Sequence, residues 1–160
     1  MQKTRFRGFL FGLTFLCVLL IQPVFAQEKM EKGGMMMKEK SLYQRLGGYD
    51  AIAAVVDDFL GRLLGDPQMK RFFNGVSMDS QRRIRQLVVD QLCWATGGPC
   101  VYIGRSMKAS HAGLGISEAD WQSSVTHLIA SLDKFKVPQK EKDDVLAAVS
   151  GLKADIVEKP

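Results

Sequence analysis

Length and charge allow one domain with short appendages. The 160 residues carry a formal net charge of +5. Three of the 22 basic residues, Lys3, Arg5 and Arg7, lie within the first 26 residues, which hold no acidic residue, so residues 27–160 carry only +2. A charge this small gives no support for nucleic acid or an anionic membrane as a partner, and we expect neither.

The first 26 residues have the layout of a secretory signal peptide. A basic start precedes an almost unbroken apolar run over residues 8–21, and Val24-Phe25-Ala26 places small residues before a cut ahead of Gln27. The apolar run is short for a membrane span, although a retained N-terminal anchor is the alternative. We expect an exported protein, periplasmic or secreted, with no stable membrane insertion after cleavage.

Residues 27–40 are rich in Met, Lys and Glu and lack apolar periodicity, which indicates a flexible leader. The run Met35-Met36-Met37 raises the alternative of a soft-metal site. Adjacent residues on a helix do not face one site, so we favour the tether. The folded domain is then expected to span residues 41–160.

From residue 41 onward the apolar spacing is helical, and no run alternates like a strand. One apolar stripe, with Asp50 as its predicted N-cap, lies between breaks at Gly47-Gly48 and Gly65-Asp66-Pro67. A short segment ending in Phe72-Phe73 follows, and a second stripe stops at Gly97-Gly98-Pro99. The stripes contain, in order, Ile52, Val55, Val56, Phe59, Leu60, Leu63 and Leu64, then Ile84, Leu87, Val88, Gln91, Leu92 and Ala95.

Two further helices are predicted near the C-terminus. Ser117 with Asp120 three residues later has the form of a capping box and opens a helix that bears Trp121 and continues to Phe135. Pro138 suits the first turn of a last helix, whose stripe runs to Ile156. Four main helices in about 115 residues can enclose a core, which predicts an all-α domain.

The crossing over residues 97–116 is long and holds five glycines. A connection in a helical bundle usually needs about 2–8 residues, so a buried ligand is one way to organise this stretch. A brief turn of helix is expected at residues 107–111 and carries His111, one of only two histidines. A histidine held between two breaks can be the axial ligand of a haem iron.

Several short motifs together resemble the group 1 truncated haemoglobins. They are Ser41 to Gly48 (SLYQRLGG), Asp58-Phe59, Phe72-Phe73, Gly97-Gly98 and Met107 to Ile116 (MKASHAGLGI). The match covers about residues 41–157, and its specificity lies in the order and spacing of the motifs. The resemblance implies a two-over-two helical sandwich, in which two antiparallel helix pairs enclose a b-type haem.

The resemblance also assigns the binding residues. His111 matches the proximal iron ligand, a neutral imidazole whose other nitrogen needs a hydrogen-bond acceptor, and Phe73 matches the phenylalanine that packs on the haem face. Phe72 and Phe59 are expected as pocket walls. Further expected contacts near the haem or its propionates are Leu60, Ile84, Leu87, Val88, Tyr102, Arg105, Met107, Lys108 and Trp121.

Two other haem attachments are disfavoured. His127 could be a sixth iron ligand, but the family alignment places it away from the distal side, and a hydrogen-bonded structural histidine is preferred. The chain has no Cys-x-x-Cys-His motif for covalent attachment.

The sequence departs from many family members on the distal side. The tyrosine that often follows the phenylalanine matching Phe59 is replaced by Leu60. Aligned backward from Gly97-Gly98, Ile84 and Val88 take the places of the distal glutamines.

A second alignment, forward from Phe73, places Gln81 near the iron and points Arg85 into the pocket. We prefer the backward alignment because it keeps one apolar stripe, and it predicts a mostly apolar pocket with Gln91 as the nearest polar candidate. A hydrogen bond to bound dioxygen contributes about 1.5–3 kcal/mol. A pocket without a donor is therefore expected to lose oxygen faster and to prefer nitric oxide and carbon monoxide.

Cys93 and Cys100 flank the break at Gly97-Gly98-Pro99, seven positions apart. A tight turn would let the two sulfurs meet in a disulfide, which an oxidising compartment favours and which contributes about 2–3 kcal/mol. It would pin the distal helix to the ligand-bearing loop. Two reduced thiols are the alternative if the protein is not exported.

Three functions follow from these observations. The first is an exported haem protein that reversibly binds dioxygen, nitric oxide or carbon monoxide as carrier, store or sensor, as a monomer or weak dimer. The second is haem-dependent nitric oxide detoxification, which needs an external reductase because the chain has no flavin or nicotinamide motif; the apolar pocket also offers no obvious acid–base group. The third is a haem-free helical interaction module. We expect a binding protein rather than an enzyme.

Overall fold

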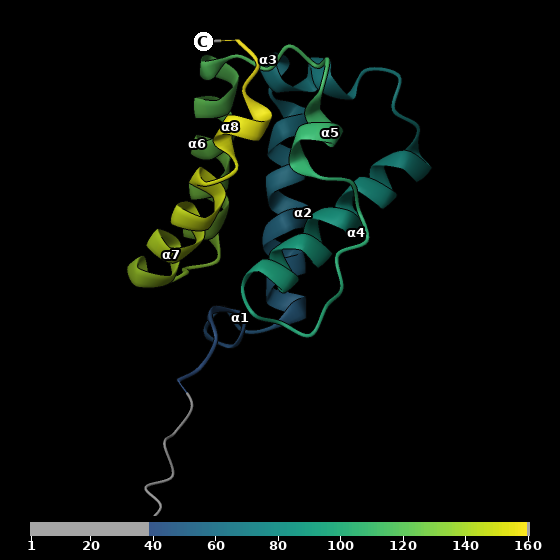
Figure 1. The fold of residues 1–160 in the computed structure, drawn as a ribbon. Coiled ribbons are helices and arrows are strands. Elements are labelled where there is room, and N and C mark those ends of the chain that lie inside the picture. The colour runs from purple at the N-terminus through teal and green to yellow at the C-terminus, as the bar shows by residue number, and fades with distance from the viewer. Residues whose placement is uncertain (1–38, 160) are drawn as a thin grey trace, which may run out of the picture. The chain divides into compact units, whose positions relative to one another are not determined.

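The structure, a computed structural model, describes residues 39–159. The predicted signal peptide and almost all of the predicted leader lie outside the described residues. Within them the chain is helical, and Figure 1 shows the arrangement. The elements are α1 (Leu42–Arg45), α2 (Tyr49–Gly65), α3 (Pro67–Lys70), the 3₁₀ turn η1 (Arg71–Phe73), α4 (Met78–Ala95), α5 (Met107–His111), α6 (Glu118–Lys134), α7 (Gln139–Ser150) and α8 (Lys153–Ile156).

The central helix α2 begins two residues earlier than predicted. Its N-cap is Gly48, whose φ of 83° lies in the left-handed region that favours glycine. The prediction of Asp50 as N-cap is therefore wrong. Asp50 instead lies in the first turn, where its carboxylate faces the positive end of the helix. The predicted end at Gly65 is confirmed, and Asp66 then caps α3 by accepting a hydrogen bond from the Gln68 backbone N–H at 2.8 Å.

The helix α4 begins earlier than its apolar stripe. Ser77 caps it by accepting from the Ser80 N–H at 3.2 Å, and the stop at Gly97-Gly98 is confirmed because the helix ends at Ala95. The backbone N–H of Tyr43 donates to Thr96 O at 2.8 Å. The end of α4 is thus tied to α1.

The last predicted helix is divided into two. α7 ends at Ser150, Gly151 follows, and the short α8 covers Lys153–Ile156. Glycine weakens a helix because it has no side chain to restrict its backbone, and the Leu152 N–H already turns back to Val149 O at 2.9 Å. The prediction of one continuous helix is therefore wrong, and the division lets α8 pack against α5.

Two clusters of buried side chains hold the four long helices together. One lies between α2 and α4, and the other joins α2, α6 and α7, so α2 contributes to both. Figure 1 shows the pair α2 and α4 beside the pair α6 and α7. This arrangement confirms the predicted all-α, two-over-two fold. The buried members are Ile52, Ala53, Val56 and Val89 in the first cluster and Val55, Leu128, Leu132 and Val145 in the second.

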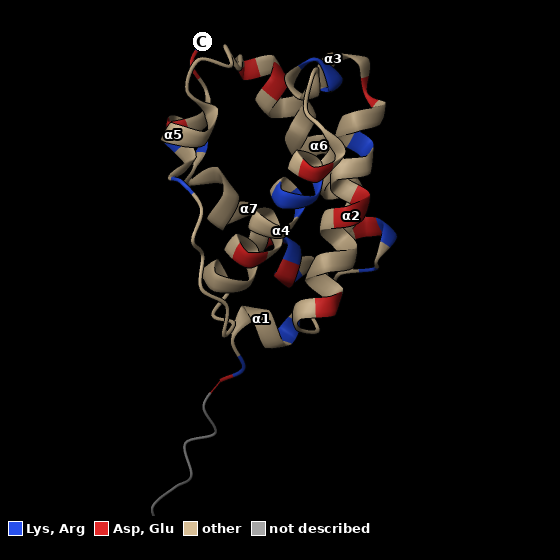
Figure 2. Ribbon diagram, turned by 90° about the vertical axis from the view of Figure 1, so that its right-hand side faces the viewer, with Lys and Arg blue, Asp and Glu red and all other residues tan. Residues whose placement is uncertain are grey.

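Charge is spread over this framework. Figure 2 shows acidic and basic residues interspersed on the helices facing the viewer. One charged group is structural: Asp58 on α2 accepts hydrogen bonds from Arg62 Nε at 2.6 Å and from Ser131 Oγ of α6 at 2.8 Å. Hydrogen bonds, with that from Lys134 the largest cause, hold the pKa of Asp58 well below its usual range. None of the helices in residues 39–159 has the length and hydropathy needed to cross a membrane.

Candidate haem site

The short helix α5 presents His111 at its last position. Ser106 caps the helix by accepting a hydrogen bond from the Ala109 N–H at 3.2 Å. The Nδ1 atom of His111 lies 2.8 Å from Met107 O. Because a carbonyl only accepts, this contact places the ring proton on Nδ1 and leaves the lone pair on Nε2. Met107 thus takes part through its backbone, as the acceptor that a histidine ligand needs.

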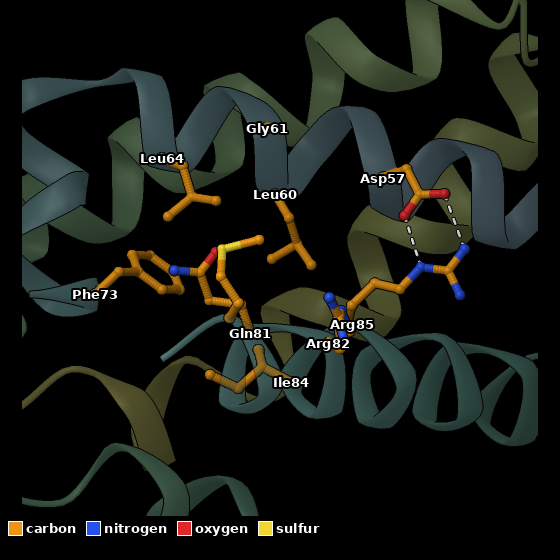
Figure 3. Close-up of a pocket in the computed structure, with 10 residues that line it drawn as sticks. Asp57, Leu60, Gly61, Leu64, Phe73, Gln81, Arg82, Ile84 and Arg85 are labelled. Carbon is orange, nitrogen blue, oxygen red and sulfur yellow. Dashed lines mark hydrogen bonds and ion pairs between the residues drawn. The ribbon is translucent and has the colours of Figure 1, made fainter. Parts of the chain in front are cut away.

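A cavity of about 270 Å³ lies between α2 and α4. Figure 3 shows Leu60 and Leu64 of α2 on one side, Gln81 and Ile84 of α4 on the other, and Phe73 of η1 at one end. The predicted haem contacts Leu60, Phe73 and Ile84 are therefore brought together. The complete lining is Asp57, Leu60, Gly61, Leu64, Phe73, Met78, Gln81, Arg82, Ile84 and Arg85.

The lining of this cavity corrects the predicted alignment of α4. Gln81 and Arg85 line it, as the forward alignment predicted, whereas Val88 packs with the buried cluster of α2 and α4, and Gln91 is not among the lining residues. Residues three and four apart share one helical face, so the turn that directs Ile84 into the cavity directs Gln81 and Arg85 there as well. The placement of Val88 and Gln91 at this cavity by the backward alignment is therefore wrong, whereas Ile84 and the mainly apolar character of the lining are as predicted.

Gln81 and Arg85 differ in their partners. Gln81 Nε2 donates to Val76 O at 3.2 Å, so its amide is held near the start of α4. Arg85 donates from Nε and Nη2 to the two carboxylate oxygens of Asp57, at 2.6 and 2.8 Å. Figure 3 shows this ion pair turned away from Phe73. The hydrogen bond from Arg85 lowers the pKa of Asp57, and the same contact raises the pKa of Arg85.

The other predicted haem contacts do not line this cavity. Phe59 packs on the cluster of α2, α6 and α7 rather than lining the cavity. The Arg71 guanidinium lies 4.7 Å from the centroid of the Phe72 ring. Tyr102 donates from its hydroxyl to Arg105 O at 2.7 Å. Of the rest, Leu87 is half-buried on α4, Trp121 is buried on α6, and Arg105 and Lys108 are exposed.

A pair of apolar side chains near α5 was not predicted. Val101 and Ile103 are 74% and 82% exposed, the highest values among the large hydrophobic residues that are exposed in the described chain. They flank Tyr102 in the loop before α5. Nothing in the helical periodicity pointed to these two residues, because they lie outside any helix.

These residues fit a haem. Nε2 of His111 takes no hydrogen bond from residues 39–159, so its lone pair is available to an iron ion. The cavity supplies mainly apolar walls with a phenylalanine at one end. The loop before α5 adds exposed apolar side chains. One nitrogen donor and apolar surroundings are the setting in which proteins hold haem.

The second histidine has a structural partner. His127 Nε2 lies 2.7 Å from Asp66 Oδ2, and Ser123 donates to the same oxygen at 3.1 Å. The hydrogen bond with His127 is the largest cause that lowers the pKa of Asp66. His127 is therefore a hydrogen-bonded histidine between α6 and the start of α3, as preferred from the sequence.

The two cysteines meet at the end of α4. The sulfur atoms of Cys93 and Cys100 lie 2.01 Å apart, and the Gly98 N–H between them donates to Cys93 O at 2.8 Å. A side chain on Gly98 would collide with Tyr43 and with Cys93. Glycine is thus needed for the close turn that brings the two sulfurs together.

Known proteins are similar to this chain in sequence and in the arrangement of their helices. The family profile of the bacterial-like globins matches residues 41–158. The group 1 truncated haemoglobin GlbN of Mycolicibacterium paratuberculosis is 34% identical over 116 residues, covering 72% of this chain and 83% of that protein. GlbN of Synechocystis is 35% identical over 118 residues, covering 71% of this chain and 92% of that protein.

Solved structures agree with the sequence matches. The ferric truncated haemoglobin of Tetrahymena pyriformis has a TM-score of 0.68 at 27% identity, covering 75% of this chain and 100% of the other. The 2/2 haemoglobin of Synechococcus, solved with covalently attached haem, has a TM-score of 0.67 at 29% identity with the same coverage. The family match extends over nearly all of the described residues. The chain therefore belongs to the bacterial-like globin family, among the group 1 truncated haemoglobins.

Proposed function

We propose that this truncated haemoglobin is an exported protein that carries haem b on His111 and reversibly binds dioxygen, nitric oxide or carbon monoxide as a carrier, store or sensor. The observation that carries this proposal is the His111 contact with Met107 O, at 2.8 Å, which prepares Nε2 as the iron donor. When bound, haem supplies an iron that coordinates a diatomic gas reversibly. The protein supplies the donor, the walls and the distal polar groups.

Each part of the chain has a role in this proposal. The hydrogen bond from Nδ1 holds the His111 ring in one orientation and raises the donor strength of Nε2. Leu60, Leu64 and Phe73 keep water away from the gas-binding cavity. The Gln81 amide can exchange its bond to Val76 O for a hydrogen bond to a ligand in the cavity.

Absorption spectra of the purified mature protein in the ferric, ferrous and carbon monoxide forms test the proposal. We expect a strong Soret band with the features of a histidine-bound iron. Absence of that band after addition of haem would leave only the haem-free interaction module. Extraction of the haem into acidified organic solvent distinguishes haem b, which is released, from a covalently attached haem, which is not.

Gln81 favours nitric oxide detoxification as a second activity. An amide donor in the cavity prolongs the residence of dioxygen, which must be present when nitric oxide arrives. Conversion of the two gases to nitrate consumes one electron per turnover, so an external reductase is required. Rapid decay of the oxygenated ferrous form on adding nitric oxide, with stoichiometric nitrate, is the expected result, and slow decay would exclude this activity.

Export is proposed from residues 1–26 and from the cysteines. A cleaved signal peptide would leave Gln27 as the first residue. In an oxidising compartment Cys93 and Cys100 would remain a disulfide. Thiol titration of the unfolded, unreduced mature protein should give no thiols, and two thiols per chain would contradict the proposal.

A further inference from the structure

The C-terminal residues run alongside the segment that follows His111. The backbone N–H groups of Glu158 and Lys159 both donate to Ile116 O, at 2.9 and 3.1 Å, and the Glu118 N–H donates to Lys159 O at 3.1 Å. Ser117 and Lys159 form a parallel bridge. Glu158 and Lys159 are thus hydrogen-bonded to the segment between α5 and α6 and to the first residue of α6.

The Glu158 side chain extends this contact toward His111. Its Oε1 accepts from the Gly113 N–H at 2.5 Å, and its Oε2 accepts from the Gly115 N–H at 2.6 Å. Hydrogen bonds to an ionised carboxylate are about twice as strong as those between neutral groups. The two N–H groups, that of Gly113 first, lower the pKa of Glu158.

The backbone of this segment suits such a contact. Gly113 and Gly115 have φ values of +80° and +65°, in the left-handed region. This conformation turns alternate N–H groups to one side, where the single carboxylate receives both. Glycine permits this turn directly after α5, which favours it over residues with a Cβ atom.

The helix α5 alone gives little control over the direction of His111. It has only five residues, and isolated helices of that length are unstable in water. After His111 its end is closed by the Ala112 N–H bonding to Lys108 O at 3.0 Å. The packing of α8 on α5 and the contacts of Glu158 are therefore the long-range restraints on the ligand-bearing turn.

We propose that Glu158 is a positioning residue for the proximal ligand: its carboxylate fixes the turn after His111 and thereby sets the orientation of the imidazole toward the iron. This inference rests on the proposed function of His111. Loss of the carboxylate leaves both glycine N–H groups to water, so the turn gains alternative conformations. The ring then samples more orientations. The average bond from Nε2 to iron becomes weaker, and the spread of bond strengths becomes wider.

Resonance Raman spectroscopy of the ferrous, ligand-free holoprotein tests the inference. In Glu158→Gln and Glu158→Ala we expect the iron–histidine stretching band to move to lower frequency and to broaden, and Glu158→Asp should restore part of the wild-type band. The matched control is Asp155→Asn, which removes an exposed carboxylate from α8, three residues before Glu158. An unchanged band in both Glu158 variants would overturn the inference.

A second measurement on the wild-type protein does not depend on the folding of variants. Amide hydrogen exchange should show slow exchange at Gly113 and Gly115 although both lie in a non-helical loop. Rapid exchange at both amides would overturn the inference. Failure of the proposed function is distinguishable, because a wild-type protein without an iron–histidine band refutes the role of His111 itself.

Discussion

In the proposed function, single side chains in the cavity between α2 and α4 set how strongly a gas is held. On the side of α4 that lines this cavity, Gln81 is the polar side chain whose amide is held only by a backbone carbonyl. Replacing Gln81 with Leu should increase the oxygen dissociation rate about tenfold, because a ligand hydrogen bond contributes about 1.5 kcal/mol. Stopped-flow oxygen release measures this. Gln91→Leu, outside the cavity lining, is the matched control, and equal effects of the two changes would contradict the assignment.

The charge of Arg85 is a second property of the cavity that can change ligand affinity. Asp57 neutralises its guanidinium, so the charge of Arg85 should have little effect on ligand affinity in the wild-type protein. Asp57→Asn should raise the affinity of the ferric protein for fluoride by about two- to fivefold, since exposed ion pairs contribute about 0.2–1 kcal/mol. The gain should vanish in the double variant with Arg85→Gln. If fluoride affinity still rises in the double variant, the ion pair between Arg85 and Asp57 does not control ligand affinity.

The proximal residue could be predicted from the sequence, but the residues around it could not. His111 could be predicted because it is one of two histidines and lies between glycine-rich breaks. The position of Gln81 was left open because the spacing from Phe73 and the spacing from Gly97 gave two alignments of α4, and apolar periodicity favoured the one that keeps Gln81 out of the cavity. Glu158 was missed because its partners lie 43 and 45 residues away, a distance at which no local pattern exists.

At the scale of elements, Asp120 joins the segment carrying Phe72 and Phe73 to the start of α6. It is 1% exposed and accepts hydrogen bonds from Gln68 at 2.9 Å and Arg71 at 2.7 Å, as well as from Ser117. Asp120→Asn places an amide among these donors and should lower the free energy of unfolding by about 2–3 kcal/mol. Urea denaturation measures this, and a loss near zero would refute the role of Asp120.

The same carboxylate gives a pH dependence. Burial alone would raise the pKa of Asp120, but the hydrogen bonds from Ser117 and Gln68 and the charge of Arg71 lower it to about 2. A depressed pKa in the folded state contributes stability above the unfolded value of about 4, and this contribution is lost as the pH falls toward 2. The free energy of unfolding should therefore fall less steeply between these values in Asp120→Asn than in the wild type. Equal slopes would contradict this.

Element boundaries were predictable where a capping side chain or a glycine break marked them. The capping box of Ser117 and Asp120 opens α6 as predicted, and the stop before Gly97 held for α4. The division at Gly151 was not predictable from periodicity, because the apolar stripe continues across it to Ile156. Contacts of α8 with α5 decide that division, and they depend on tertiary structure.

At the scale of the whole molecule, the pairing of Cys93 and Cys100 connects α4 to the loop that leads to α5. Closing a loop of this length stabilises the folded state by about 2–3 kcal/mol. Reduction, or Cys93→Ser with Cys100→Ser, should lower the melting temperature by several degrees while the Soret band remains. A melting temperature insensitive to reductant would mean that the pair does not restrain the native fold.

In the proposed function, the chain binds haem iron through one protein nitrogen, the Nε2 atom of His111. Resonance Raman spectra of the ferrous wild type and of His111→Gly, with and without added imidazole, test it most directly. We expect an iron–histidine stretching band in the wild type, its loss in His111→Gly, and the return of an iron–imidazole band when imidazole is added. An unchanged iron–histidine band in His111→Gly would show that another residue binds the iron and would refute the role of His111.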